Sequence, residues 1–172
     1  MKTALLGAGA LGSVLAARLA QGGSEVVLIA EGARAERLRR GLRVEGLTRF
    51  HATLSVQPTP EGCDWLLLCT KSWQLEPLLP RLAEWGVPVV ACQNGLLAVE
   101  MLADALGAEN VAGFVTGLGA ARHPDGSVMH AGDGYAVLGA TVGAPTAALR
   151  QLHDAFSAGG IEATLTSDLP GE

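Results

Sequence analysis

The sequence predicts an α/β fold in which helices cover both faces of a mainly parallel sheet, a doubly wound arrangement, with an antiparallel meander appended. Two observations predict it. Over most of the 172 residues, short runs that are apolar at every position alternate with amphipathic stretches, and strands apolar on both faces are typical of parallel sheets covered by helices. Beyond residue 111, strand-like segments are separated by glycine-containing turns, which is typical of antiparallel pairing.

The chain before residue 111 should form alternating strands and helices. The helices are predicted from apolar residues spaced at i, i+3, i+4 and i+7, which lie on one face. Pro77 and Pro80 are compatible with the third helix if both lie in or beside its first turn, where backbone N–H groups lack helical partners. Strands are expected at 3–6, 25–30, 65–69 and 88–92, and helices at 11–20, 33–40, from near 77 to 85, and 97–106.

The other segments are expected to be mostly strands. Residues 43–56 have a mixed pattern around Gly46, which predicts a small hairpin or an irregular strand. A helix near the end should carry Leu149, Leu152 and Phe156 on one face. The strands expected beyond residue 111 are 113–121, 127–130, 135–138 and 161–165. Together these elements predict one domain over residues 1–168.

A glycine-rich turn lies between the first expected strand and the first expected helix. Its sequence, Gly7-Ala8-Gly9-Ala10-Leu11-Gly12, matches G-x-G-x-x-G. In this context the first glycine allows the tight turn, the second lets the main chain approach a pyrophosphate, and the third allows the helix to pack closely on the strand. The free N–H groups at the helix N-terminus then face the phosphates. The motif predicts a Rossmann-type dinucleotide site, and the alternative is a glycine turn that binds nothing.

Glu31 follows the second expected strand, where the residue that contacts the adenosine ribose usually lies, about 20 residues after the glycines. A carboxylate there accepts hydrogen bonds from the 2′-OH of NAD and repels the 2′-phosphate of NADP. Arg34 and Arg37 are close enough in sequence to offset that repulsion. Alternatively, Glu31 only caps the following helix.

Lys71 and Asn94 follow the carboxyl ends of two successive apolar strands. Ligands of doubly wound sheets bind at this edge, so both are candidate site residues. The alternatives are a solvated lysine and a simple turn at Asn94-Gly95. The sequence has no nucleophile elbow, no Walker motif and no metal-ligand spacing of its histidines and cysteines, so no metal is expected.

Composition argues against several kinds of partner. The formal net charge is −5, and basic residues cluster only at 34–40, which disfavours nucleic acid as a partner. The N-terminal apolar run is too short to span a bilayer and lacks the pattern of a signal peptide. Cys63, Cys69 and Cys92 form no CxxC pair. We therefore expect a cytoplasmic protein that binds neither nucleic acid nor membranes.

Several separated motifs point to one family. Besides the glycine motif they are Leu67-Leu68-Cys69-Thr70-Lys71-Ser72-Trp73-Gln74, Gln93-Asn94-Gly95, and the stretch from Ala120-Ala121-Arg122 through Asp125-Gly126 to His130-Ala131-Gly132-Asp133-Gly134. With these motifs the chain resembles the N-terminal domain of ketopantoate reductase (2-dehydropantoate 2-reductase) over essentially its whole length. The resemblance implies hydride transfer from NADPH to the 2-keto group of ketopantoate, giving pantoate on the route to pantothenate and coenzyme A.

The resemblance also implies roles for individual residues. Gly7 to Gly12 would bind pyrophosphate, Lys71 and Asn94 would lie near the nicotinamide ribose and the substrate, and Ala121 would contact the cofactor through its backbone. Asn94 would also contact the substrate. The carbonyl that accepts a hydride needs a hydrogen-bond donor to stabilise its developing negative charge.

Two departures from the family qualify this implication. Glu31 stands where the family commonly has an arginine that pairs with the 2′-phosphate, so NAD is an alternative to NADP. The family continues into a helical C-terminal domain that carries the catalytic lysine, a carboxylate and most substrate contacts, and 169–172 would begin the linker to it. We therefore expect a cofactor-binding part that is inactive alone, through truncation, proteolysis or a shortened gene.

Other interpretations of the sequence stay open. One is a non-enzymatic module that senses dinucleotides, because a fold alone does not define a function. Another is a reductase of a different 2-keto or 3-hydroxy acid. An apolar face left exposed for a second domain would favour a homo-oligomer.

Overall fold

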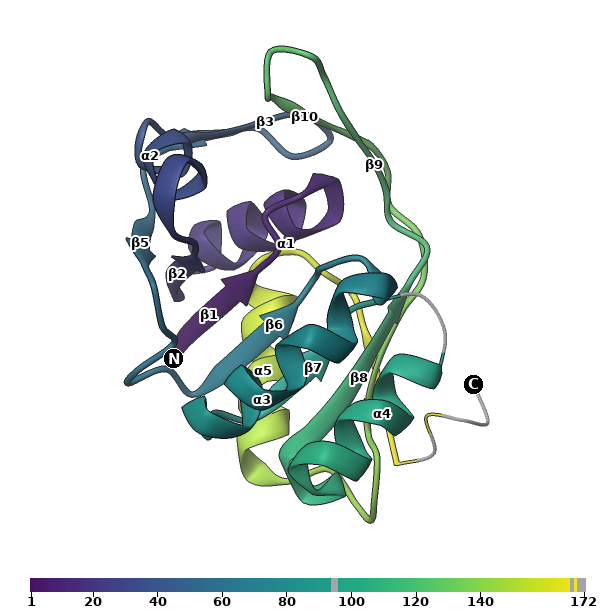
Figure 1. The fold of residues 1–172 in the computed structure, drawn as a ribbon. Coiled ribbons are helices and arrows are strands. Elements are labelled where there is room, and N and C mark those ends of the chain that lie inside the picture. The colour runs from purple at the N-terminus through teal and green to yellow at the C-terminus, as the bar shows by residue number, and fades with distance from the viewer. Residues whose placement is uncertain (94–95, 168, 170–172) are drawn as a thin grey trace.

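The computed structural model describes residues 1–93, 96–167 and 169. In this part of the chain the largest element is an eight-stranded sheet with the order β5-β2-β1-β6-β7-β8-β11-β12 (Figure 1). The first six strands in this order are parallel, β11 is antiparallel to β8, and β12 is parallel to β11. The strands are β1 (Lys2–Leu6), β2 (Glu25–Ile29), β5 (Ser55–Gln57), β6 (Trp65–Leu68), β7 (Val89–Ala91), β8 (Val111–Thr116), β11 (Ala136–Ala140) and β12 (Thr164–Thr166).

Helices cover both faces of this sheet, as the sequence predicts. On one face, Leu15 and Phe156 pack in the same buried cluster as Leu5 of β1. On the other face, Leu102 packs with Ala4, the residue beside Leu5, because successive residues of a strand point to opposite faces. The helices are α1 (Ala10–Gln21) and α5 (Ala147–Ala158) on the first face, α3 (Leu75–Trp85) and α4 (Leu97–Leu106) on the second, α2 (Gly32–Arg39) after β2, and two short 3₁₀ turns, η1 (Ser72–Gln74) and η2 (Ala108–Asn110).

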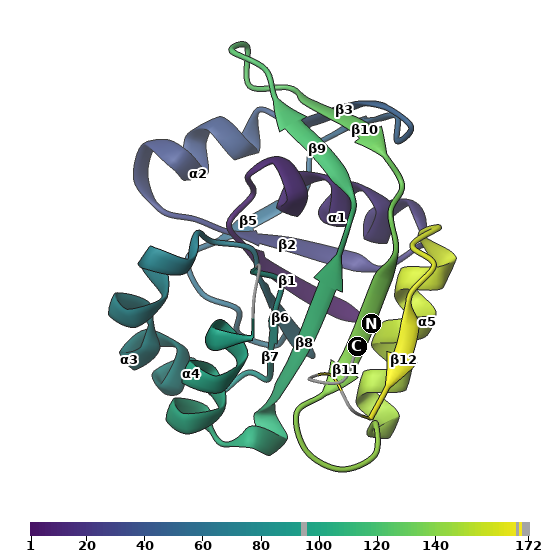
Figure 2. The same cartoon turned by 90° about the vertical axis from the view of Figure 1, so that its right-hand side faces the viewer.

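A second, smaller sheet covers the outer side of α1 (Figures 1 and 2). Its order is β4-β3-β10-β9, with β3 (Leu42–Gly46), β4 (Phe50–Ala52), β9 (Gly119–Arg122) and β10 (Val128–Gly132). Val44 and Val128 belong to the same buried cluster as Val14 and Leu15 of α1. The helix is therefore packed between two sheets, and its residues 12–17 and Leu19 are all buried.

The segment 43–56 contains the expected hairpin, formed by β3 and β4. Residues 113–121, expected as a single strand, form two strands instead. β8 ends at Thr116 in the large sheet, and β9 begins at Gly119 in the small one. Antiparallel pairing is confirmed for β8 with β11 and for β9 with β10, but the expected meander is divided between two sheets. The division arises because the chain must leave the large sheet to cover α1.

The third helix also differs from the sequence prediction. It begins at Leu75, after the turn η1, so Pro77 lies in its first turn but Pro80 lies inside the helix. The early start buries Leu75, which is 1% exposed and packs on the second face of the sheet. Within the described ranges, none of the helices has the length and apolar character needed to cross a membrane.

Candidate functional site

The glycine-rich turn lies at the junction of β1 and α1, at the carboxyl edge of the parallel strands. The strand order reverses at β1, with β2 on one side of it and β6 on the other, and doubly wound sheets bind ligands at such a reversal. Gly7 has a φ of +102°, and a Cβ there would lie 2.6 Å from the carbonyl carbon of Cys69. Glycine is required at this position for both reasons.

The other two glycines have contrasting surroundings. A Cβ on Gly12 would lie 2.3 Å from the carbonyl oxygen of Gly7, so only glycine lets α1 approach β1 this closely. A Cβ on Gly9 would meet only that same oxygen, at 3.9 Å. Nothing in the described protein therefore requires glycine at position 9, and its missing side chain leaves space beside the turn.

Gly9 is also the N-cap of α1, and no side chain caps the helix there. The first helical bond is donated by the Ser13 N–H to the Gly9 carbonyl, at 3.1 Å. The N–H groups of Ala10, Leu11 and Gly12 have no acceptor within the helix. They carry the positive end of the helix dipole, and the first turn contains no acidic residue. This arrangement is suited to an anionic group such as a pyrophosphate.

Glu31 occupies the N-cap position of α2, but its side chain does not cap the helix. Its carboxylate instead accepts a hydrogen bond from Arg81 of α3, at 3.1 Å. The Arg81 guanidinium also lies over the Trp85 ring, 5.0 Å from its centroid. The suggestion that Glu31 caps the helix through its side chain is therefore wrong, and the carboxylate is paired with a residue that is distant in sequence.

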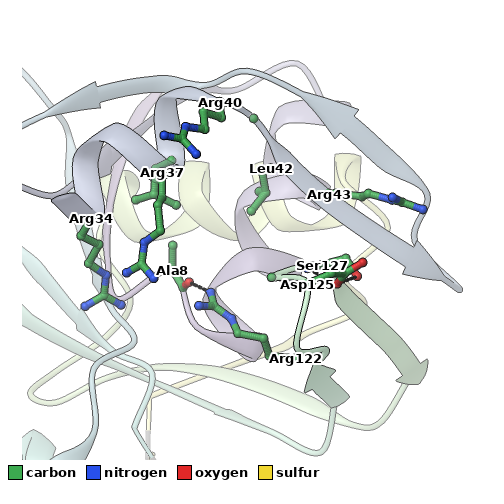
Figure 3. Close-up of a pocket in the computed structure, with 12 residues that line it drawn as sticks. Ala8, Arg34, Arg37, Arg40, Leu42, Arg43, Arg122, Asp125 and Ser127 are labelled. Atoms are coloured by element: carbon green, nitrogen blue, oxygen red, sulfur yellow. Dashed lines mark hydrogen bonds between the residues drawn. The ribbon is translucent and has the colours of Figure 1, made fainter.

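A cavity of about 330 Å³ lies between the glycine turn, α2 and the small sheet (Figure 3). The guanidinium groups of Arg34 and Arg37 extend from α2 toward the turn, where Arg122 of β9 donates a hydrogen bond to the carbonyl of Ala8. Other lining residues are Leu38, Arg40, Gly41, Leu42, Arg43, Asp125, Gly126 and Ser127. Five arginines and one carboxylate thus line a cavity beside the anion-suited turn.

The positive charges that line the cavity affect one another's ionisation. Burial lowers the pKa of Arg122, and the nearby positive charges of Arg34 and Arg37 lower it further. The Asp125 carboxylate accepts hydrogen bonds from the Ser127 hydroxyl and backbone N–H, which lower its pKa. Its negative charge faces Arg43, on the other side of the cavity from Arg34 (Figure 3).

Further polar residues follow β6 and β7 at the carboxyl edge. Lys71 is exposed and precedes η1, and its backbone N–H donates a hydrogen bond to the Gln74 Oε1 at 3.1 Å. Gln93 is 7% exposed, and its Nε2 donates to the Thr70 hydroxyl at 3.0 Å. The Gln93 Oε1 is buried without a donor from the described residues. Asn94, the other residue predicted here, lies outside the residues that the structure describes.

The structure brings Ala8 and Arg34, predicted as cofactor contacts, into the lining of the same cavity. Ala121 lies in β9, paired with Met129 of β10. The sequence prediction missed Arg122, the residue after Ala121, because its approach to Ala8 depends on a sheet that was not expected. Among the described residues, no group of His, Cys, Asp and Glu is gathered as a metal site would require.

The fold and the glycine turn define the chain as a Rossmann-type dinucleotide-binding domain of the kind found in oxidoreductases. A sequence model described as ketopantoate reductase PanE/ApbA matches residues 3–143. The chain belongs to this family.

Individual relatives agree with this assignment. The chain is 32% identical over 166 residues to 2-dehydropantoate 2-reductase of Archaeoglobus fulgidus, covering 96% of this chain and 56% of the relative. The structure of 2-dehydropantoate 2-reductase from Geobacter metallireducens superposes with a TM-score of 0.81 at 28% identity, over 96% of this chain and 58% of that one. D-mandelate dehydrogenase with NADH and anilino(oxo)acetate gives 0.84 at 27% identity, over 99% and 58%. The chain thus spans less than three fifths of these relatives.

Proposed function

We propose that this chain is the cofactor-binding part of an NADP(H)-dependent reductase that converts ketopantoate to pantoate. The observation that carries the proposal is the turn at residues 7–12, whose uncapped helix N-terminus and vacant side-chain position at Gly9 suit a pyrophosphate. Membership of the ketopantoate reductase family supports the reaction and the substrate. NAD(H) is the competing cofactor, because Glu31 would favour it.

The residues present fit a dinucleotide. The N–H groups of residues 10–12 would hold the pyrophosphate, and the adenosine end would lie toward Glu31 and Arg34. Lys71 and Asn94 would lie near the nicotinamide ribose and the substrate, and Ala121 would contact the cofactor through its backbone. The unsatisfied Gln93 Oε1 would accept a hydrogen bond from the ligand, since buried acceptors rarely stay unpaired. When bound, NADPH supplies the hydride that reduces the keto carbon.

This part of the protein would bind and orient the cofactor, and Asn94 would help to position the substrate. The main proton donor and most substrate contacts would come from residues beyond those that align here, because the chain spans only part of its relatives. We expect the 172-residue chain to show negligible ketopantoate-dependent oxidation of NADPH, followed at 340 nm. Turnover at the ~1–10³ per second typical of enzymes would contradict the proposal that residues outside this chain are needed for catalysis.

The binding proposal is tested by calorimetric titration with NADP⁺ and NAD⁺. We expect one site per chain in the wild type and a loss of at least about 100-fold in affinity for both dinucleotides in Gly9→Val, because the side chain would occupy the space needed by the pyrophosphate. Gly132→Ala is the matched control, because Gly132 has no positive φ and a Cβ there meets nothing within 4 Å. Unchanged affinity in Gly9→Val would overturn the assignment of the site.

A reductase of another 2-keto acid is the second candidate. It is favoured by the similarity to D-mandelate dehydrogenase, whose structure contains NADH and anilino(oxo)acetate. The two candidates share the cofactor site and differ in the substrate. The test uses a protein that is as long as these relatives and contains this domain. Its kcat/KM values for ketopantoate and for aromatic 2-keto acids, measured by steady-state kinetics, would distinguish the two candidates.

We place the protein in the cytoplasm on the basis of its unpaired cysteines.

A further inference from the structure

The usual determinant of cofactor choice is engaged in an ion pair in this chain. Glu31 stands where a carboxylate would bind the 2′-OH of NAD and repel the 2′-phosphate of NADP. Its Oε1 is instead 3.1 Å from the Arg81 guanidinium, which partly neutralises it. Both side chains are about half exposed, so the pair is weak, but it is sufficient to reduce the repulsion that a phosphate would meet.

Positive charge is concentrated on the other side of the adenosine end of the proposed site. Arg34 and Arg37 of α2 and Arg122 of β9 converge on one cavity with Ala8 of the glycine turn (Figure 3). None of these three arginines forms an ion pair with an acidic side chain in the described part of the chain, although other arginines do. Burial lowers the pKa of Arg122 most, and the positive charges of Arg34 and Arg37 repel its guanidinium and lower the pKa further. An anion bound among them would relieve that repulsion.

The cavity has the features of a site for a phosphomonoester. Arginine forks match phosphate oxygens in pairs of hydrogen bonds. The single carboxylate of the cavity, Asp125, is hydrogen-bonded to Ser127 and faces Arg43 rather than Arg34. Arg122 is fixed against the Ala8 carbonyl, so at least one of the three guanidinium groups is already positioned.

We propose that Arg34, Arg37 and Arg122 form an anion site that binds a phosphomonoester on the ligand of the glycine turn, namely the 2′-phosphate of NADP(H). In this chain these three arginines select the cofactor, in place of the residue at position 31. This inference rests on the proposed function, since it requires a dinucleotide in the turn. It goes beyond that function by assigning the choice between NADP and NAD to residues of two different elements.

The test is a calorimetric comparison of NADP⁺ and NAD⁺ in single variants. We expect wild type to prefer NADP⁺, and Arg37→Ala and Arg34→Ala each to weaken NADP⁺ at least about tenfold while changing NAD⁺ less than about twofold, because charge-assisted hydrogen bonds to the phosphate are lost. Arg39→Ala is the matched control, since Arg39 lies on the same helix and outside the cavity. Arg122→Lys should keep the charge but lose paired hydrogen bonding, with an intermediate effect.

Two further measurements separate the possible outcomes. Adenosine 2′,5′-bisphosphate should bind more tightly than adenosine 5′-monophosphate, and this advantage should shrink in Arg37→Ala and in high salt. Glu31→Ala should leave the preference for NADP⁺ nearly unchanged. Equal loss of NADP⁺ and NAD⁺ in Arg37→Ala, an equal effect of Arg39→Ala, or a wild type that prefers NAD⁺ would overturn the inference. Failure of wild type to bind either dinucleotide would instead overturn the proposed function.

Discussion

At the scale of single residues, glycines with the same sequence signature have different physical roles. Gly12 is required by the protein itself, because a Cβ there would lie 2.3 Å from the Gly7 carbonyl oxygen. Gly9 has no neighbour closer than 3.9 Å to an added Cβ and a negative φ of −81°. The fold therefore does not require glycine at position 9, whereas the proposed pyrophosphate would. The motif predicted both roles, and the structure separates them.

This separation can be tested by stability. Gly12→Ala should lower the free energy of unfolding by about 1–3 kcal/mol, because the helix must move away from β1, and this cost exceeds the gain in helix propensity. Gly9→Ala is the matched control and should change it by less than about 0.5 kcal/mol. Urea denaturation followed by circular dichroism measures both. A stable Gly12→Ala variant would mean that the close approach of α1 to β1 is not required.

Residue identity alone was a poor guide to the role of Glu31. Its position in the sequence predicted either a ribose contact or a cap. The structure shows a carboxylate bound to Arg81, 50 residues away. The role of Arg122 was equally hard to predict, because Arg122 contacts Ala8, which lies 114 residues away in the sequence. Contacts of this kind leave no local pattern in a single sequence.

At the scale of elements, α3 shows how burial overrides local preference. Proline removes a backbone donor and its ring crowds the preceding turn, so a helix that begins near Pro77 is the unstrained expectation. The structure instead begins the helix at Leu75, which is buried, and accepts Pro80 in the interior. The hydrophobic contact of Leu75 with the sheet therefore decides the boundary.

The two prolines of α3 should respond differently to substitution. Pro80→Ala restores a donor for the Glu76 carbonyl, and we expect the free energy of unfolding to rise by about 1–2 kcal/mol. Pro77→Ala lies in the first turn, where no helical partner exists, so it should be neutral or lower stability by up to about 1 kcal/mol through the unfolded state. Both are measured by urea denaturation. A destabilised Pro80→Ala would show that the ring has a packing role.

At the scale of the whole molecule, the small sheet is the feature that the sequence did not predict. A network of polar groups contributes to holding it against α1. Arg18 of α1 donates through Nε to the Thr48 hydroxyl at 2.7 Å, and that oxygen lies 2.8 Å from Nδ1 of buried His130 in β10. Arg18 also pairs with Asp133 at 2.9 Å. The same sheet carries Arg122 to the glycine turn, so the network supports the proposed site from a distance.

Removing the central hydroxyl should weaken this attachment. Thr48→Val leaves the Arg18 Nε and the His130 ring without a shared partner, and we expect a loss of about 1–3 kcal/mol in the free energy of unfolding. Thr53→Val is the control, because Thr53 is exposed. Thermal and urea denaturation provide the measurement. Equal effects of the two substitutions would show that the network contributes little.

The carboxyl edge of the large sheet also exposes apolar side chains. Trp73, Leu97 and Tyr135 are 76%, 68% and 67% exposed, and they lie in η1, at the start of α4 and just before β11. All three positions adjoin strand ends at this edge, since β11 begins opposite the end of β8. Exposed apolar patches commonly mark interfaces. In the longer relatives, we expect the corresponding edge to be covered by the part of the chain that does not align here.

Without such a cover, this edge should cause self-association. Sedimentation velocity should show concentration-dependent association of the 172-residue chain, and the triple substitution Trp73→Ser, Leu97→Ser and Tyr135→Ser should abolish it. Leu47→Ser with Val142→Ser is the control, because these exposed residues lie away from the edge. A wild-type chain that stays monomeric at all concentrations would contradict the proposal.

The sequence by itself determined the alternation of strands and helices, the glycine turn and the family, because each depends on neighbouring residues or on local motifs. Periodic burial and the steric freedom of glycine act over a few residues and are visible in a single chain. The tertiary structure alone decided the second sheet around α1, the pairing of Glu31 with Arg81, and the arginine-lined cavity. These depend on long-range packing, in which the free energy of covering an apolar helix outweighs local preference.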